Sequence, residues 1–134
     1  MKKLLLLFLM VATQAAFAQD GAFKADVIKY LELSGQRLTI EKVTENFKQN
    51  IPAEKHAEFK KEMDAAIDDF LSKMADVYMT EFTHDDIKAA IKFYETPAGK
   101  KFTSKAGVLY DKGQAVGQEW GMGLQGIMMK YMQQ

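Results

Sequence analysis

The fold class is decided by residues 59–82, FKKEMDAAIDDFLSKMADVYMTEF, because their apolar side chains recur with the pitch of an α-helix. The apolar positions stand three or four residues apart and trace one face: Phe59, Met63, Ile67, Phe70, Leu71, Met74, Val77, Tyr78 and Phe82. Lysines and carboxylates occupy the opposite face. The pattern predicts a long amphipathic helix from Pro52 to about Phe82. Its length, unusual without an internal cap, predicts a kink or break near Asp64.

The same helical spacing continues on both sides of this segment. Toward the N-terminus it predicts helices over 22–34 and 40–50, with Gly35 as a left-handed stop and Thr39 as a cap. Toward the C-terminus it predicts helices over 84–94, from Pro97, and over 106–132. No stretch alternates apolar and polar residues for long enough to predict a sheet. We therefore expect an all-α fold, a compact bundle of about five to six helices with antiparallel neighbours joined by short loops.

The first 18 residues have the composition of a secretory signal peptide. Lys2 and Lys3 form its charged start, residues 4–12 its apolar stretch, and Ala16-Phe17-Ala18 offers small residues for cleavage after Ala18. No later stretch is apolar over the roughly 20 residues that a membrane-spanning helix requires. We expect an exported protein, periplasmic or secreted, whose processed form is a single helical domain over 19–134 without a transmembrane segment.

Composition excludes several classes of chemistry. The chain has no cysteine, so disulfides, thiolate nucleophiles, cysteine-based metal sites and a cysteine-linked lipid are excluded. It carries 18 basic and 18 acidic residues, and loss of Lys2 and Lys3 leaves a slight acidic excess, which argues against a nucleic-acid partner. Stability must come from apolar packing.

Two helix starts flank the short helix predicted over 84–94. Thr83 and Asp86 have the spacing of a capping box, with Asp in place of the usual Glu. Thr96 precedes Pro97, which combines a capping hydroxyl with a residue suited to the first helical position. A sharp turn is expected between the two helices, at Glu95-Thr96.

The other residues around this turn allow two interpretations. In the structural one, Phe93 and Phe102 belong to the core and Gly99 permits close packing. In the functional one, three polar side chains line a cleft and bind a polar group: Tyr94, Thr96 and Lys101. The structural interpretation is the leading one.

The segment around this turn resembles a known family. The residues that carry the resemblance are Phe82-Thr83, Asp86-Ile87, Phe93-Tyr94, Thr96-Pro97, Gly99 and Lys101-Phe102. They are similar to the signature of the exported bacterial family called domain of unknown function 2059, and Trp120 is compatible, so the family-like segment covers about 82–120. The chain has Ala106-Gly107 where related sequences often have proline. The resemblance implies a helical, secreted or periplasmic protein and supplies no catalytic residues.

The closing helix over 106–132 is amphipathic and rich in glycine. Its apolar positions are Leu109, Val116, Trp120, Leu124, Ile127 or Met128, and Tyr131. Gly113, Gly117 and Gly121 lie four residues apart, and each costs up to about 1 kcal/mol relative to alanine inside a helix. Close contact with another helix would offset this cost; otherwise the helix breaks around Gly121-Met122-Gly123.

Residues with metal-binding or catalytic chemistry are few and poorly spaced. His56 and His84 have no ligand spacing, and a zinc site would need distant carboxylates such as Glu81 or Asp85. Met128, Met129 and Met132 suit packing first, an adaptable binding surface second and a Cu(I) site last. We expect no metal and no cofactor.

The leading functional hypothesis is a non-catalytic periplasmic interaction module, in which the Met- and Gly-rich C-terminal helix contacts an envelope protein or a copy of itself. The candidate ligand or partner contacts are Tyr94, Thr96, Lys101, Trp120, Met128 and Met132, with Gly113, Gly117 and Gly121 in helix packing. One alternative is a small carrier of an apolar, lipid-like molecule held between helices. Another is an enzyme that uses Tyr94, Lys101 and nearby acids.

Overall fold

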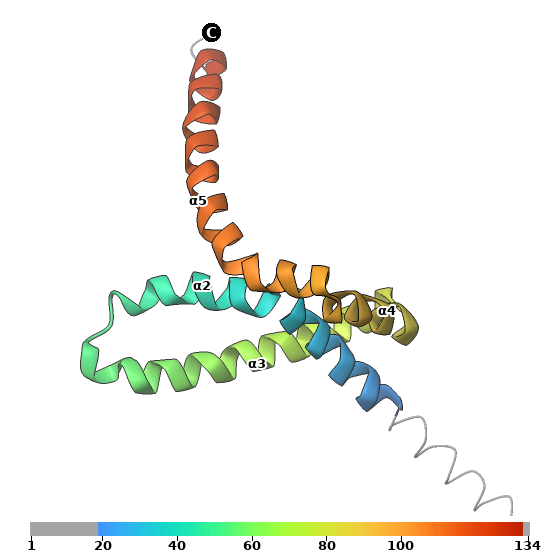
Figure 1. Ribbon diagram of the computed structural model, residues 1–134. Helices are drawn as coiled ribbons and strands as arrows, with labels where there is room; N and C mark the ends of the chain where they lie inside the picture. Colours follow the sequence, from blue (N-terminus) through green and yellow to red (C-terminus); the bar gives the residue numbers. More distant parts are fainter. Residues whose placement is uncertain (1–18, 133–134) are drawn as a thin grey trace, which may run out of the picture.

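A computed structural model describes residues 19–132, and the elements within that range are helical (Figure 1). An N-terminal helix over 19–33 is followed by α2 (Gln36–Lys48), a short 3-10 turn η1 (Ala53–Lys55), α3 (His56–Glu81), α4 (His84–Glu95) and α5 (Pro97–Met132). The all-α prediction is confirmed. The expected signal peptide, residues 1–18, lies outside the described residues.

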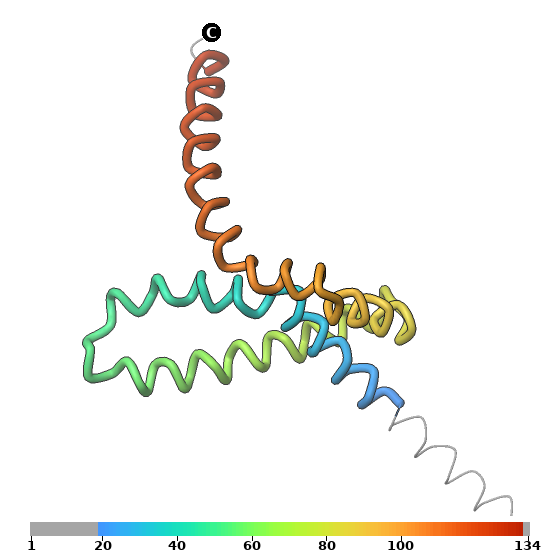
Figure 2. The backbone as a smooth tube through the Cα atoms, in the orientation of Figure 1, coloured from blue at the N-terminus to red at the C-terminus, as the bar shows by residue number. Residues whose placement is uncertain are grey.

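The core is formed by three of the helices. Its buried residues are Val27 and Leu31 of the N-terminal helix, Ile67, Leu71 and Ala75 of α3, and Ile87 and Ile91 of α4. Within each helix these residues stand four residues apart, so each helix presents one narrow apolar face. Helix α2 runs antiparallel beside α3, and the start of α5 lies against α4 and α2 (Figure 2).

Gly35 makes the sharp connection between the N-terminal helix and α2. Its φ of 82° is in the left-handed region, as predicted, and a Cβ at this position would lie 2.7 Å from Cβ of Ala106 in α5. Helix α2 therefore begins directly at Gln36, earlier than expected. Thr39 is not its cap, because it lies inside the first turn and its hydroxyl donates to the Gly35 carbonyl at 3.0 Å.

Helix α3 runs without interruption from His56 to Glu81, so the predicted break near Asp64 is wrong. The buried face continues through this region, and Lys60 pairs with Asp64 at 2.7 Å across one turn. Pro52 does not begin this helix. It precedes η1 in an extended conformation, and the 3-10 turn leads into α3.

The predicted starts of α4 and α5 are confirmed. The Thr83 hydroxyl accepts from the backbone N–H of Asp86 at 3.3 Å, while the Asp86 carboxylate accepts from the backbone N–H of Thr83 at 2.9 Å. The Thr96 hydroxyl accepts from the backbone N–H of Gly99 at 3.1 Å, and Pro97 is the first residue of α5. A Cβ on Gly99 would overlap backbone atoms of Phe93 and Tyr94, so this position requires glycine.

The two helices predicted over the C-terminal third form one continuous helix. Helix α5 spans Pro97–Met132, and the alternative of a break around Gly121-Met122-Gly123 is wrong. Figure 1 shows that α5 bends where it leaves α2 and that its last part projects away from the other helices. We call residues 113–132 the arm and residues 19–112 the body. Over 19–132 no helix combines the length and the apolar character needed to cross a bilayer.

Candidate functional site

The aromatic residues of the Phe82–Phe102 motif lie at the surface. Phe93 is 45% exposed and Phe102 61% exposed, with their ring centroids 6.1 Å apart, so the prediction that both belong to the core is wrong. Helix geometry gives the reason for Phe93. It follows the buried Ile91 by two residues, which turns it about 200° away from the core face. The motif therefore contributes to an exposed aromatic surface.

The three polar residues proposed as a cleft have separate structural roles. Tyr94 packs edge-on against Tyr30, with ring centroids 6.1 Å apart, while Thr96 caps α5 and Lys101 is exposed on it. None of them lines either groove described below. Burial raises the pKa of Tyr30, and the neighbouring Tyr78 and Tyr94 raise it further. Such a phenol keeps its proton at neutral pH and is a poor general base.

The acidic residues near this motif are held in structural pairs. Lys29 donates to the Glu95 carboxylate at 2.7 Å, an ion pair that lowers the pKa of Glu95 and raises that of Lys29. The hydroxyl and backbone N–H of Thr83 lower the pKa of Asp86. Both carboxylates therefore remain ionised and already have partners, which leaves the enzyme hypothesis without an acid of raised pKa here.

The two histidines bind different partners in different regions of the body. His56 Nε2 lies 2.8 Å from the carbonyl oxygen of Ile51, near the start of α3. His84 is half-buried: its Nε2 lies 2.7 Å from Asp26 Oδ2, and its ring stacks on that of Phe23 with centroids 4.9 Å apart. Over 19–132, no three His, Asp or Glu side chains lie close enough together to hold a metal ion.

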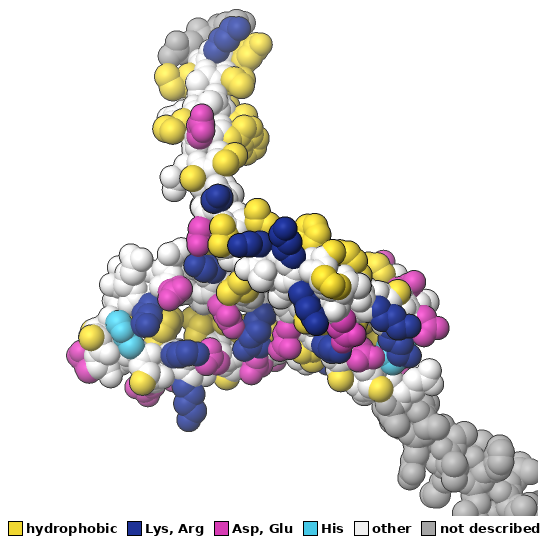
Figure 3. Space-filling model, in the orientation of Figure 1, with side chains coloured by type: hydrophobic (Ala, Val, Ile, Leu, Met, Phe, Trp, Pro, Cys, Tyr) yellow, Lys and Arg dark blue, Asp and Glu magenta, His cyan; other side chains and the backbone are white. Residues whose placement is uncertain are grey.

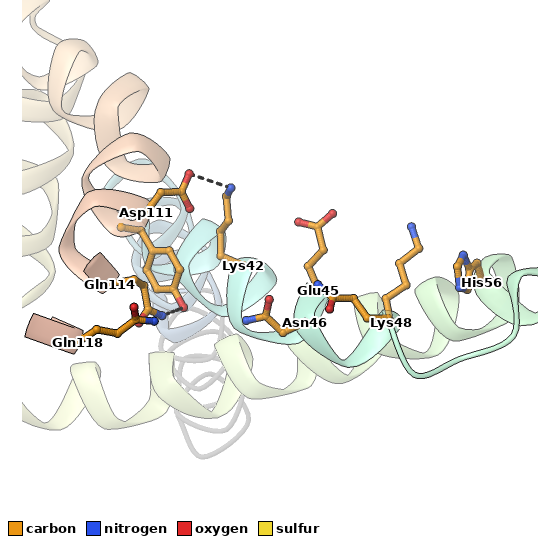
Figure 4. A pocket seen from close by; sticks show the side chains of 10 residues that line it. Lys42, Glu45, Asn46, Lys48, His56, Asp111, Gln114 and Gln118 are labelled. Carbon is orange, nitrogen blue, oxygen red and sulfur yellow. Dashed lines mark hydrogen bonds and ion pairs between the residues drawn. The ribbon is translucent and has the colours of Figure 1, made fainter. Parts of the chain in front are cut away.

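A groove of about 720 Å³ opens between α2 and α5. Figure 4 shows its side chains, among them Lys42 and Asp111, which pair at 3.2 Å, and Gln114, which donates to the Tyr110 hydroxyl at 2.7 Å. The lining is almost entirely charged or amide side chains. This surface suits solvent and small ions better than the lipid-like ligand of the carrier hypothesis.

A smaller groove of about 230 Å³ lies between α2 and α3. Its apolar residues are Phe59, Met63 and Ile67, and charged side chains such as Glu41 and Lys60 line the rest. Sites for small molecules usually occupy about 300–1,000 Å³. The carrier hypothesis therefore finds no apolar cavity of suitable size in either groove.

The most distinctive surface is a row of large apolar side chains along α5. We call it the stripe: Phe102, Leu109, Val116, Trp120, Leu124, Ile127 and Tyr131. At about 100° per residue, these seven fall within about 80° of arc on one face of the helix. Trp120 and Tyr131 are each 67% exposed, and of the seven only Leu124 is half-buried. Figure 3 shows hydrophobic side chains along the arm and over the body beside it.

Residues 68–126 match the model of a family described as "Uncharacterized protein conserved in bacteria (DUF2059)". This segment of the chain is similar to that family. No curated protein and no solved structure matches it. The DUF2059 match confirms the resemblance and extends it on both sides of the predicted segment 82–120. It runs from α3 through α4 into the arm and contains the stripe from Phe102 to Leu124.

The glycines of the DUF2059 segment divide into two groups. Gly99 is packed against its own chain, whereas a Cβ on Gly113, Gly117 or Gly121 would meet nothing within 4 Å. By helical angle Gly113 lies within the stripe, Gly117 at its edge and Gly121 beyond it. Their predicted role in helix packing thus has no partner helix among residues 19–132, and it stays a prediction about another chain.

Sequence reasoning found only part of the stripe. Trp120 had been singled out as a contact residue and lies on the stripe, whereas Met128 borders it and Met132 lies outside it. The stripe residue that the sequence did not identify is Phe102, which extends the stripe from the arm onto the body. The seven-residue steps from Phe102 to Leu109 and from Leu109 to Val116 are the signal that could have identified it.

Proposed function

We propose that this protein is an exported helical interaction module of the cell envelope, without catalytic chemistry of its own, that docks a partner helix onto the stripe. The observation that carries the proposal is the exposure of the stripe. If each of its three aromatic side chains presents about two thirds of 150–250 Å², these alone expose about 300–500 Å². That already equals the largest apolar patch of a typical monomer, and larger patches mark interaction sites.

The shape of the stripe favours a helix as its partner. Along the arm the apolar face is narrow, as in paired helices, rather than broad. The polar side of the arm carries only two charged residues, Glu119 and Lys130, and has glutamines at several other positions. Helices that lie on membrane surfaces usually have a polar face rich in lysine and arginine. The near-neutral polar side therefore supports a protein partner over a lipid surface.

Export is supported by the composition of residues 1–18, which is that of a secretory signal peptide. We expect osmotic shock of cells that express the full chain to release a processed form beginning at Gln19. Mass spectrometry of the released protein measures the cleavage point. Retention of the unprocessed chain in the cytoplasm would refute export and leave the docking proposal intact.

Photo-crosslinking in intact cells tests the docking proposal. A photoreactive amino acid at Val116 lies on the stripe, whereas one at the neighbouring Ala115 is rotated about 100° and faces away. We expect ultraviolet light to produce a discrete cross-linked species from position 116 and little from position 115, and mass spectrometry identifies the attached protein from the sequence of its peptide. Equal cross-linking from both positions, or none from position 116, would contradict docking through the stripe.

A further inference from the structure

We infer that the end of the arm is a reversible oxidation site, at which methionine thioethers become sulfoxides and change an apolar surface into a polar one. We call residues 122–132 the tip. Its methionines are Met122, Met128, Met129 and Met132. The inference goes beyond the proposed function and does not depend on it, because it concerns the chemistry of the chain before any partner docks.

The methionines of the tip are exposed to solvent, whereas those of the body are packed. Each of the four side chains on the tip is between 51% and 78% exposed. The body methionines, Met63, Met74 and Met79, are half-buried and pack against the core. Oxidants reach a thioether from solvent, so an accessible methionine reacts before a packed one. The tip should therefore be oxidised before the body.

Packing within the chain does not explain the methionines of the tip. Their spacing favoured packing for Met128, Met129 and Met132, but all three are more than half exposed, so that expectation is wrong for the described residues. By helical angle the four methionines lie within about 120° of arc beside the stripe. Among the residues of the tip, Gln125 is the one polar side chain on this side. The core and the stripe therefore leave these methionines without a structural role.

Methionine provides all the sulfur of this chain, which has no cysteine to compete for an oxidant. With hydrogen peroxide, the thioether sulfur attacks one peroxide oxygen, the O–O bond breaks and a sulfur–oxygen bond forms. The sulfur is oxidised by two electrons and the peroxide is reduced to water. A methionine sulfoxide reductase reverses the change: two thiols are oxidised to a disulfide, and the sulfoxide oxygen leaves as water.

Oxidation changes the surface character of the tip. The stripe covers about 80° of the circumference of the helix and the methionines about 120° more, so the unmodified tip is apolar on most of its sides. Each sulfoxide adds a polar oxygen that accepts hydrogen bonds, and burying such an oxygen without a donor is unfavourable. The oxidised tip therefore keeps the stripe as its apolar face and loses the rest of its apolar surface.

Peptide mapping after mild oxidation tests the location of the site. Purified protein is treated with hydrogen peroxide, and mass spectrometry measures the sulfoxide at each methionine over time. We expect the tip methionines to react at least about fivefold faster than Met74, which packs against the core. Protein unfolded in urea is the control, because unfolding exposes every methionine and should remove the difference. Equal rates in the folded protein would overturn the inference.

Reversibility is tested on the same oxidised protein. It is incubated, still folded, with dithiothreitol and the two methionine sulfoxide reductases, one for each sulfoxide epimer. We expect mass spectrometry to show that each tip methionine loses its added oxygen. Sulfoxide that persists on the folded chain, although the same enzymes remove it from the unfolded chain, would show that the site is not reversible and would overturn that part of the inference.

Hydrophobic-interaction chromatography tests the change of surface. We expect the wild type to elute earlier after peroxide treatment, because the tip has become polar. A variant with M122L, M128L, M129L and M132L has no thioether on the tip, and peroxide should leave its retention unchanged. The matched control carries M63L, M74L and M79L in the body, keeps the methionines of the tip, and should shift as the wild type does. A full shift in the tip variant would overturn the inference.

Discussion

The body and the arm use the same apolar spacing with opposite results. Leu71 in α3 is 2% exposed, whereas Leu109, on the stripe in α5, is 59% exposed. Both sit on helix faces where apolar residues recur every three or four positions. The difference is that α3 has two other helices against its apolar face, whereas among residues 19–132 the stripe has a neighbour only at Phe102, which lies beside Phe93 of α4. Amphipathic spacing thus specifies that a face is apolar, and a neighbouring element decides whether it is buried.

Amide hydrogen exchange should give the largest difference between the two regions. Amides of α3 are protected by global stability, typically 5–15 kcal/mol, whereas the arm in a dilute monomer is an isolated helix of marginal stability. We expect α3 amides near Leu71 to exchange at least about a thousandfold more slowly than arm amides. Equal protection in dilute protein would mean that the arm packs on its own body.

Truncation of a leucine to alanine should give the second-largest difference, because it should destabilise the body much more than the arm. Leu71→Ala removes a buried side chain and should lower the free energy of unfolding by about 2–5 kcal/mol, from lost burial and the cavity left behind. Leu109→Ala is the matched control and should change it by less than about 0.5 kcal/mol in the monomer. Urea denaturation at low protein concentration measures both. A comparable loss from the two variants would contradict the exposure of the stripe.

Replacing a glycine by alanine should destabilise the body but stabilise the arm. Gly99→Ala forces a Cβ into the backbone of Phe93 and Tyr94, and we expect a loss of about 1–3 kcal/mol or more. Gly117→Ala meets open space and should stabilise the arm by up to about 1 kcal/mol. Thermal unfolding reports the first change, and the helical circular dichroism signal reports the second. Stabilisation by Gly99→Ala would disprove the close contact at the start of α5.

The capping box should give the smallest effect. Thr83→Ala removes the hydroxyl that caps α4 and should cost about 1 kcal/mol. The depressed pKa of Asp86 means that its contribution is present above its ordinary pKa and is lost as pH falls through its lower folded-state value. The free energy of unfolding of the wild type should therefore fall in acid with a steeper slope than that of Thr83→Ala. Identical acid slopes would exclude this linkage.

Local chemistry was readable from the sequence. Gly35, the Thr83–Asp86 box and Thr96-Pro97 each act within a few residues, so their roles follow from the backbone groups beside them. Helix continuity was harder to predict. Near Asp64 an ion pair and an unbroken core face sustain α3, and in the arm five glycines do not interrupt α5. Whether a helix continues depends on the helix propensity summed over many residues and on tertiary packing, so it cannot be predicted from any single residue.

The candidate site was only half predictable for the same reason. The spacing of Val116 and Trp120 shows an apolar face, but nothing in the sequence says that the bundle leaves this face uncovered. Phe102 looked like a core residue because its type and spacing suit a core. Its position depends on how Gly99 seats α5 against the end of α4, a contact between separate helices.

The close contact between Gly35 and α5 helps to set the direction of the arm. The residue abuts Ala106 at the base of α5, and the arm beyond extends about 30 Å. If α5 tilted by about 5° at this contact, the tip of the arm would move sideways by nearly 3 Å, about half a helical pitch. Any larger side chain at position 35 would therefore re-aim a distant contact surface while leaving every residue on that surface unchanged.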